Sequence, residues 1–152
     1  MAQYVTTIEA QAYFENKLHI PVWVEADEDQ RNRALREATI RIDQLAFRGA
    51  KTDSVQDLEW PRINTPYADT DIPQRVKDAT CEVAYALLDG AEPDLEQESL
   101  SVSSEGYSAA RTTYARDSAP EHFAAGIPSS LAWKYLKPLL GDVRGIKLSR
   151  VS

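Results

Sequence analysis

The chain has 152 residues, of which 43% are hydrophobic, and this predicts a single domain with one modest core. Its 24 acidic and 17 basic residues give a net charge of −7, which argues against a nucleic-acid binder because phosphate contacts need clustered lysine and arginine. Cys81 is the only cysteine, so no disulfide can form within the chain, as expected for a reducing compartment.

The first predicted helix begins after Thr6, in the stretch TTIEAQAYFENKL. Thr6 as N-cap, with Glu9 three residues later, has the pattern of a capping box, in which each side chain accepts a hydrogen bond from the other residue's backbone N–H. We expect the helix to end before Pro21, because the residue that precedes a proline is disfavoured in the helical region.

The second predicted helix follows Asp27, which is expected to cap it, with Gln30 three residues later. Gly49 is expected just beyond its C-terminus, at the C′ position. Apolar residues at helical spacing predict one buried face. That face comprises Leu35, Ala38, Ile42 and Leu45.

An irregular segment with two prolines follows, and the third predicted helix opens at IPQRV, where Pro73 suits the first turn. It is expected to end at Gly90. Two apolar stripes predict a helix that is buried on both sides. The stripes are Val76, Ala79, Val83 and Leu87, and Cys81, Tyr85 and Leu88.

Residues 91–126 are acidic, rich in serine and poor in aliphatic side chains, which predicts an exposed loop or a β-hairpin. The last predicted helix opens at IPSSLAWKYLKPLL, with Pro138 near its end, and residues 141–152 form an extended C-terminal tail. The predicted fold is mainly α, a small bundle of about four helices in a single domain, residues 1–140.

No motif for catalysis or metal binding is found. His19 and His122 lack cysteines or paired carboxylates at zinc-ligand spacing, and Asp69 and Asp71 are better explained as a turn before a helix start. No nucleophile elbow, P-loop or dinucleotide-binding glycine pattern occurs. We therefore predict a protein that is not an enzyme and has no cofactor and no metal. The N-terminus has no signal-peptide pattern, and no apolar run is long enough to span a membrane.

The second helix carries a further apolar stripe on the side opposite its core face. Ile40 and Phe47 lie there, seven residues apart, beside Arg33 and Arg36. Either this side is covered within the bundle or it contacts another chain. We favour a subunit contact, because arginine and aromatic residues are enriched at protein interfaces.

The stretch LEWPR places a tryptophan in a segment without helical periodicity. We expect Trp60 to anchor this connection, since a buried indole removes on the order of 200 Å² from water. Pro61 restricts the backbone beside it. Arg62 is then held where the N–H groups of its guanidinium can donate to a carboxylate or a carbonyl. This position is also compatible with a direct subunit contact.

Four motifs occur in the order YVTTIEAQAYF, ALREATIRIDQLAFRGAKTD, LEWPR and IPQRVKDATCEVAYALL. Their order resembles that of the head–tail adaptor (head-completion or connector) proteins of tailed bacteriophages, over residues 4–90. Some members of that family are labelled DnaT-like single-stranded-DNA-binding proteins. A nucleic-acid-binding replication accessory protein is accordingly the alternative interpretation, and a basic, aromatic-lined groove would favour it.

The resemblance implies a structural virion protein that is assembled in the host cytoplasm. Its implied partners are the portal protein, further copies of itself in a twelvefold ring, and a downstream tail or stopper protein, with no membrane contact. The genome would pass through the ring during DNA ejection without specific binding. Negative charge suits such a conduit, because it repels phosphate and lets DNA slide.

Residues 127–152, which include the tail, are the one basic region that the sequence shows, with five basic residues, among them Lys134 and Lys137, and one acidic residue. In the tail the basic residues recur every three positions with apolar residues between them, which is typical of a segment that lies extended on a partner. The alternative is a solvated terminus. The predicted contact residues, against the portal or a neighbouring subunit, are Arg144, Ile146, Lys147, Leu148 and Arg150.

Overall fold

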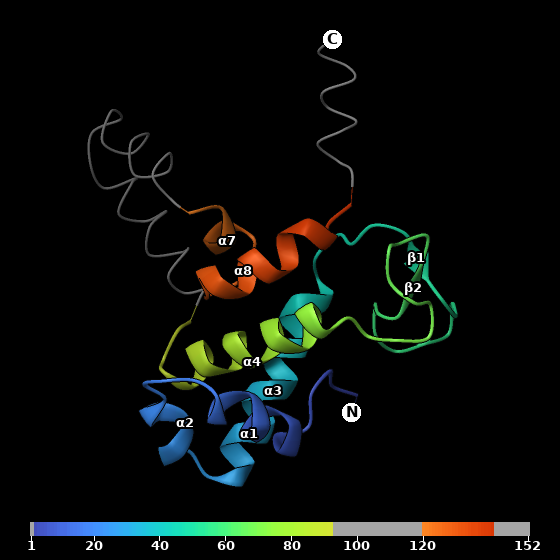
Figure 1. Ribbon diagram of the computed structural model, residues 1–152. Helices are drawn as coiled ribbons and strands as arrows, with labels where there is room; N and C mark the ends of the chain where they lie inside the picture. The colour runs from blue at the N-terminus through green and yellow to red at the C-terminus, as the bar shows by residue number, and fades with distance from the viewer. Residues whose placement is uncertain (1, 93–119, 142–152) are drawn as a thin grey trace, which may run out of the picture.

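The computed structural model describes residues 2–92 and 120–141 and shows a mainly helical fold (Figure 1). The predicted fold class is confirmed at this level, with a small sheet in addition. The described elements are α1 (Thr7–Glu15), α2 (Pro21–Glu25), α3 (Glu28–Asp43), β1 (Ala50–Lys51), β2 (Arg62–Ile63), α4 (Gln74–Leu88), α7 (Glu121–Ala124), α8 (Ser130–Leu136) and the 3₁₀ helix η1 (Lys137–Leu139).

Local sequence signals set the beginnings of the first helices. Thr6 and Glu9 form the predicted capping box of α1. The chain between α1 and α3 differs from the expectation, because Pro21 opens a further short helix, α2. This helix buries Trp23 against Phe14, with ring centroids 4.5 Å apart. The aromatic contact explains why a five-residue helix, too short to be stable alone, is held in place.

Helices α3 and α4 form the centre of the bundle, with α1 and α2 on one side and α8 on the other (Figure 1). Asp27 and Gln30 form the predicted capping box of α3. The α4 helix begins directly after Pro73, which is its N-cap, and ends at Leu88, so both boundaries lie within two residues of the prediction; Gly90 follows with a φ of 95°. Cys81 is buried, which confirms that α4 is covered on its second side.

Residues 44–73, between α3 and α4, contain a sheet that the sequence did not predict. The strands β1 and β2 pair antiparallel, with Ala50 opposite Ile63. Gly49 does not end the helix, because α3 already ends at Asp43. The glycine instead allows close approach of the strands: a Cβ there would lie 2.1 Å from the carbonyl oxygen of Ile63.

The C-terminal helices cover α4. The α7 helix lies within residues 91–126, where a loop or hairpin was expected, so that prediction is wrong for residues 121–124. The rest of the expected hairpin, residues 93–119, lies outside the described residues, as do residues 142–152. Ser129 caps α8, and Pro138 lies in the 3₁₀ turn η1 that follows it.

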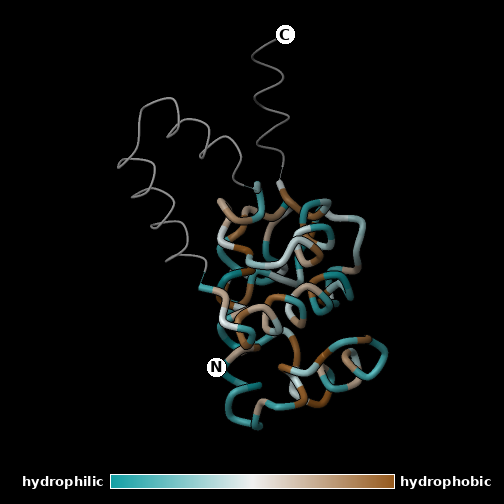
Figure 2. Tube along the Cα trace, turned by 90° about the vertical axis from the view of Figure 1, so that its left-hand side faces the viewer, coloured by the Kyte–Doolittle hydropathy of each residue, from teal (hydrophilic) through white to brown (hydrophobic). Residues whose placement is uncertain are grey.

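The last described residues run beside the segment that follows α3. Leu140 forms an antiparallel bridge with Phe47. The Gly141 N–H donates to the Ala46 carbonyl at 2.6 Å, and the Arg48 N–H donates to the Leu139 carbonyl at 3.0 Å. These bonds join the C-terminal end of the described chain to the segment that follows α3. Hydrophobic and hydrophilic stretches alternate along the helices, as expected for elements that are buried on one side (Figure 2).

Candidate interaction surfaces

Trp60 lies in the core, with 1% of its surface exposed. Its ring packs edge-on against Phe47 at 5.5 Å and against Tyr67 at 6.1 Å between centroids. Its backbone N–H donates to the Tyr4 hydroxyl at 3.2 Å, and the Trp60–Pro61 peptide bond is cis. The tryptophan thus ties the α3–α4 connection to the N-terminal segment.

Arg62 is also buried, with 7% exposed, and all five of its N–H groups have acceptors within the chain. Nε donates to the Arg48 carbonyl at 2.8 Å. Nη1 donates to the carbonyl and the carboxylate of Glu59, at 3.1 and 2.8 Å. Nη2 donates to the carbonyls of Phe47 and Gly49, at 3.3 and 2.8 Å. Because no donor is left over, the expected subunit contact by Arg62 is not supported.

The expected exposed stripe on α3 requires a correction at Phe47. Because α3 ends at Asp43, position 47 no longer follows helical spacing, and the chain turns inward there. Phe47 is 7% exposed and belongs to the core, whereas Ile40 is 42% exposed. Phe47 is therefore a core residue, and its prediction as a surface contact residue is wrong.

Three of the predicted contact residues do share one exposed surface of α3. Arg33, Arg36 and Ile40 are exposed and spaced three and four residues apart. Neither arginine forms a hydrogen bond or ion pair with another described residue. We call these three residues the α3 face.

The buried polar groups join helices. Tyr4 donates a hydrogen bond to Asp43, and burial, followed by this carboxylate, raises the pKa of Tyr4 above its usual value. Burial also raises the pKa of Asp43. Tyr13 donates to the buried Glu82, which the ammonium group of Lys17 also approaches, at 2.6 Å. Each of these two acids is partnered by a side chain from another part of the chain, so Tyr4 links the N-terminal segment to α3 and Tyr13 links α1 to α4.

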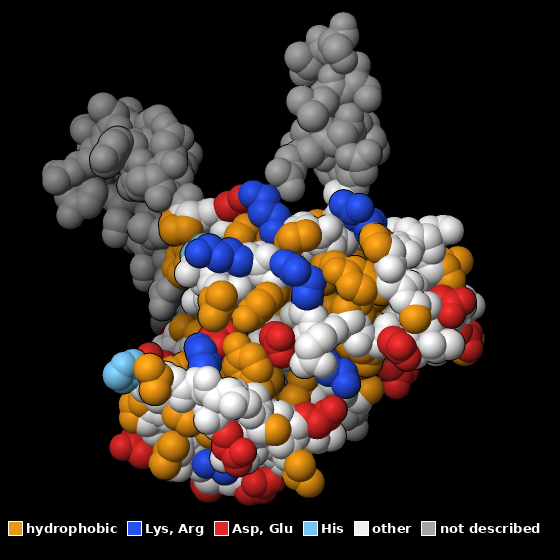
Figure 3. Space-filling model, viewed as in Figure 1, with side chains coloured by type: hydrophobic (Ala, Val, Ile, Leu, Met, Phe, Trp, Pro, Cys, Tyr) orange, Lys and Arg blue, Asp and Glu red, His pale blue; other side chains and the backbone are white. Residues whose placement is uncertain are grey.

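Basic side chains gather on the surface around α8 (Figure 3), where Lys137 is paired with Glu121 at 2.8 Å. Folding draws them together around one stretch of backbone: Arg75 donates to the Tyr135 carbonyl at 3.0 Å, and Arg48 donates to the Leu140 carbonyl at 3.3 Å. We call this surface the α8 basic face. It comprises Arg48, Arg75, Lys134 and Lys137.

The sequence indicates only part of this surface. Lys134 and Lys137 belong to the basic region at residues 127–152, whereas Arg48 and Arg75 precede it by many residues and are brought to it only by folding. The five predicted contact residues of the tail lie outside the described residues. Within residues 2–92 and 120–141, no cluster of three metal-ligating side chains and no helix fit to cross a membrane is found.

Comparison with known proteins gives one result. Residues 2–151 match the sequence model of a family described as "Putative DnaT-like ssDNA binding protein". The chain belongs to this family. The match to this DnaT-like family covers nearly the whole chain and agrees with the label that the sequence resemblance includes. It gives no support to the head–tail adaptor identity. No curated protein and no solved structure matches the chain.

Proposed function

We propose that the chain is a structural head–tail adaptor subunit, which associates with copies of itself into a ring beneath a phage portal. The α3 face carries the proposal. An exposed isoleucine beside two arginines that have no partners among the described residues has the composition of an interface centre. The longest described helix holds these side chains, and its opposite side is fixed in the core.

The charge of the chain supports the same role. A net charge of −7 in a subunit that lines a DNA channel repels phosphate and prevents the genome from adhering. Arg62 and Trp60 fit this role as residues that make the subunit rigid, since the long α3–α4 connection is fixed by their contacts. A rigid subunit loses less conformational entropy on assembly.

The test changes the α3 face and leaves Phe47 intact. We expect Ile40→Asp with Arg36→Glu to give a folded monomer that no longer joins portal rings, as measured by native mass spectrometry of mixtures with portal protein. Ile8→Asp is the matched control, because Ile8 is also an exposed isoleucine, at 81%, but lies on α1. Normal assembly by the α3 variant would exclude this face as the interface.

The second candidate function is single-stranded DNA binding, favoured by the family description and by the α8 basic face. Trp133 and Tyr135 are half-buried and lie next to the lysines of this face. Proteins that bind single-stranded DNA commonly combine basic side chains with aromatic rings on which the nucleobases stack. Fluorescence anisotropy with a labelled oligonucleotide, over a range of salt concentrations, distinguishes the two functions.

The adaptor proposal predicts no binding beyond that of other acidic proteins at physiological salt. Submicromolar binding with a steep salt dependence, lost in Lys134→Gln with Lys137→Gln, would establish the second function instead. Arg33→Gln with Arg36→Gln removes the same charge from the α3 face and serves as the control. Equal loss in both double variants would indicate a general charge effect.

A further inference from the structure

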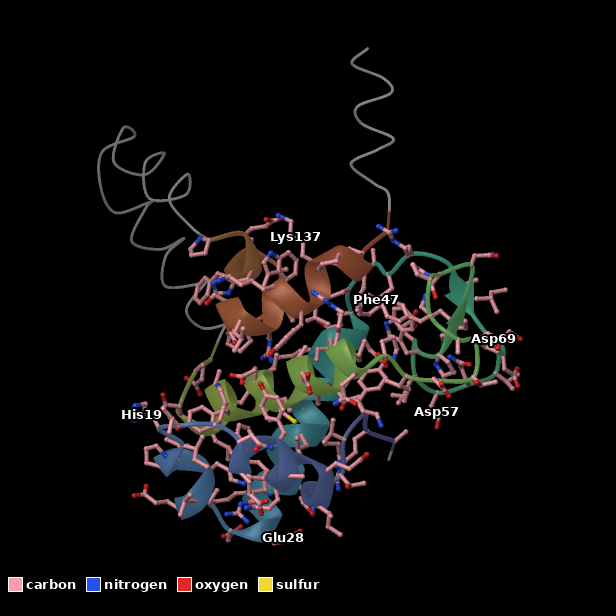
Figure 4. The ribbon with its side chains drawn as sticks, in the orientation of Figure 1. His19, Glu28, Phe47, Asp57, Asp69 and Lys137 are labelled. Atoms are coloured by element: carbon pink, nitrogen blue, oxygen red, sulfur yellow. The ribbon has the colours of Figure 1, made fainter. Side chains whose placement is uncertain are left out.

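A groove of about 550 Å³ lies beside the start of α4. Its apolar lining consists of Pro61, Tyr67, Ala68, Ile72 and Pro73. Asp71 lies at its edge, and Asp69 is exposed two residues earlier (Figure 4). Neither carboxylate forms an ion pair with a described residue, whereas Lys77, which also lines the groove, is paired with Glu9. The groove therefore combines apolar side chains with a carboxylate that has no ion-pair partner among the described residues.

We propose that this groove binds residues 142–152 of the same chain. In an extended segment, alternate side chains point to the same side. Ile146 and Leu148 would thus both face the apolar side chains of the groove. Arg144 and Arg150 would lie on that same side, one at each end, where each could approach a carboxylate. This assignment rests on the groove and on the tail sequence, and it does not depend on the adaptor role.

The length of the tail permits this contact. Gly141 is hydrogen bonded to Ala46, next to Phe47, and the Phe47, Trp60 and Tyr67 rings form a row that ends at a residue of the groove. When extended, residues 142–152 would span on the order of 35 Å, so the tail is long enough to run along the surface from Gly141.

Charge complementarity favours this occupant. Residues 142–152 contain three basic residues and one acidic residue. The groove is lined by Asp71, which has no ion-pair partner among the described residues, and by Lys77, whose charge is balanced by Glu9. A segment tethered this close has an effective concentration of roughly millimolar, so even a weak contact suffices for binding.

Disulfide trapping in the full chain tests the proposal. Thr70→Cys lines the groove and Ser149→Cys lies in the tail, and neither change removes a charge. The native Cys81 is buried, and burial raises its thiol pKa, so it does not compete. Under mild oxidation we expect an intramolecular disulfide at least about tenfold faster than in the control pair Glu25→Cys with Ser149→Cys, because α2 lies away from the groove.

Three outcomes would overturn the proposal. Equal rates in the two pairs would mean that the tail does not prefer the groove. A disulfide that joins two chains, seen as a dimer at low protein concentration, would assign the groove to the tail of a second copy. An unchanged rate after Asp69→Lys with Asp71→Lys would remove the electrostatic basis, since we expect this double variant to slow trapping severalfold. Portal binding plays no part in this assay, so its result is separate from that of the adaptor test.

Discussion

Phe47 packs edge-on against Trp60, with ring centroids 5.5 Å apart and ring planes at 72°. The backbone of Phe47 also accepts a hydrogen bond from Arg62 and bridges to Leu140. This one residue therefore connects the end of α3, the LEWPR stretch and the last described residues. Its side chain belongs to the stability of the fold, whereas Ile40 remains available to a partner.

Alanine substitution should distinguish the roles of Phe47 and Ile40 by its effect on stability. Phe47→Ala removes a buried ring and should lower the free energy of unfolding by about 3–5 kcal/mol. Ile40→Ala, at a position that is 42% exposed, should change it by no more than about 0.5 kcal/mol. Urea unfolding followed by circular dichroism measures both. Similar small losses in the two variants would place Phe47 outside the core.

Arg62→Lys tests whether the fork geometry of the guanidinium is needed. A lysine ammonium has three donors at one point and cannot serve the four carbonyls and one carboxylate that Arg62 contacts. Buried acceptors are then left without partners, at a cost of about 2–3 kcal/mol. Arg36→Lys, on the exposed α3 face, is the control and should melt as the wild type does. Equal melting temperatures for all three proteins would contradict the structural role of Arg62.

Gly49 and Gly90 form a matched pair for alanine substitution, because both have positive φ. A Cβ at position 90 has no atom within 4 Å, so Gly90→Ala should lower the free energy of unfolding only through backbone strain, by roughly 1–2 kcal/mol. Gly49→Ala brings its Cβ to 2.1 Å from the Ile63 carbonyl oxygen, so β1 and β2 must move apart. We expect a clearly larger loss of thermal stability at Gly49. If Gly49→Ala lowered the melting temperature no more than Gly90→Ala does, β1 and β2 would be able to move apart at little cost.

Alkaline titration reports on the buried tyrosines. Burial and the partner carboxylates raise the pKa of Tyr4 and of Tyr13 above the usual value of 10.0. The folded state thus favours the neutral phenols, so their contribution to stability is complete below pH 10.0 and is lost as the pH rises beyond it.

In the native protein, Tyr4 and Tyr13 should therefore contribute nothing to the rise of tyrosinate absorbance with pH. They should ionise only when the protein unfolds. Tyr4→Phe with Tyr13→Phe should leave the native part of the curve unchanged and reduce the step at unfolding. A double variant that lowers absorbance in the native range would contradict the prediction.

The helix boundaries that the sequence predicts correctly depend on neighbouring residues. The capping boxes at Thr6 and Asp27 involve side chains three residues away, and Gly90 ends α4 through its own backbone freedom. The α2 helix and the sheet depend on distant contacts. Trp23 is held by Phe14, and strands of two residues are too short to show alternation.

The surfaces were predictable only where helical spacing persists. Arg33, Arg36 and Ile40 lie within α3, and their shared exposure follows from that helix. Phe47 lies four residues past its end, where spacing along the chain no longer fixes direction. Burial of Arg62 could not be inferred either, because its acceptors are carbonyls of a turn whose shape exists only in the fold.

The bridge between residues 139–141 and 46–48 has a mechanical consequence. A force applied at the C-terminal end of the described chain, directed along the strand, would load the bonds of Gly141 and Arg48 together, in shear. Shear distributes a load over several bonds, whereas peeling breaks them one at a time. The load would then pass through Phe47 into the Trp60 core. The fold therefore has contacts at residues 139–141 that would bear tension before α8 does.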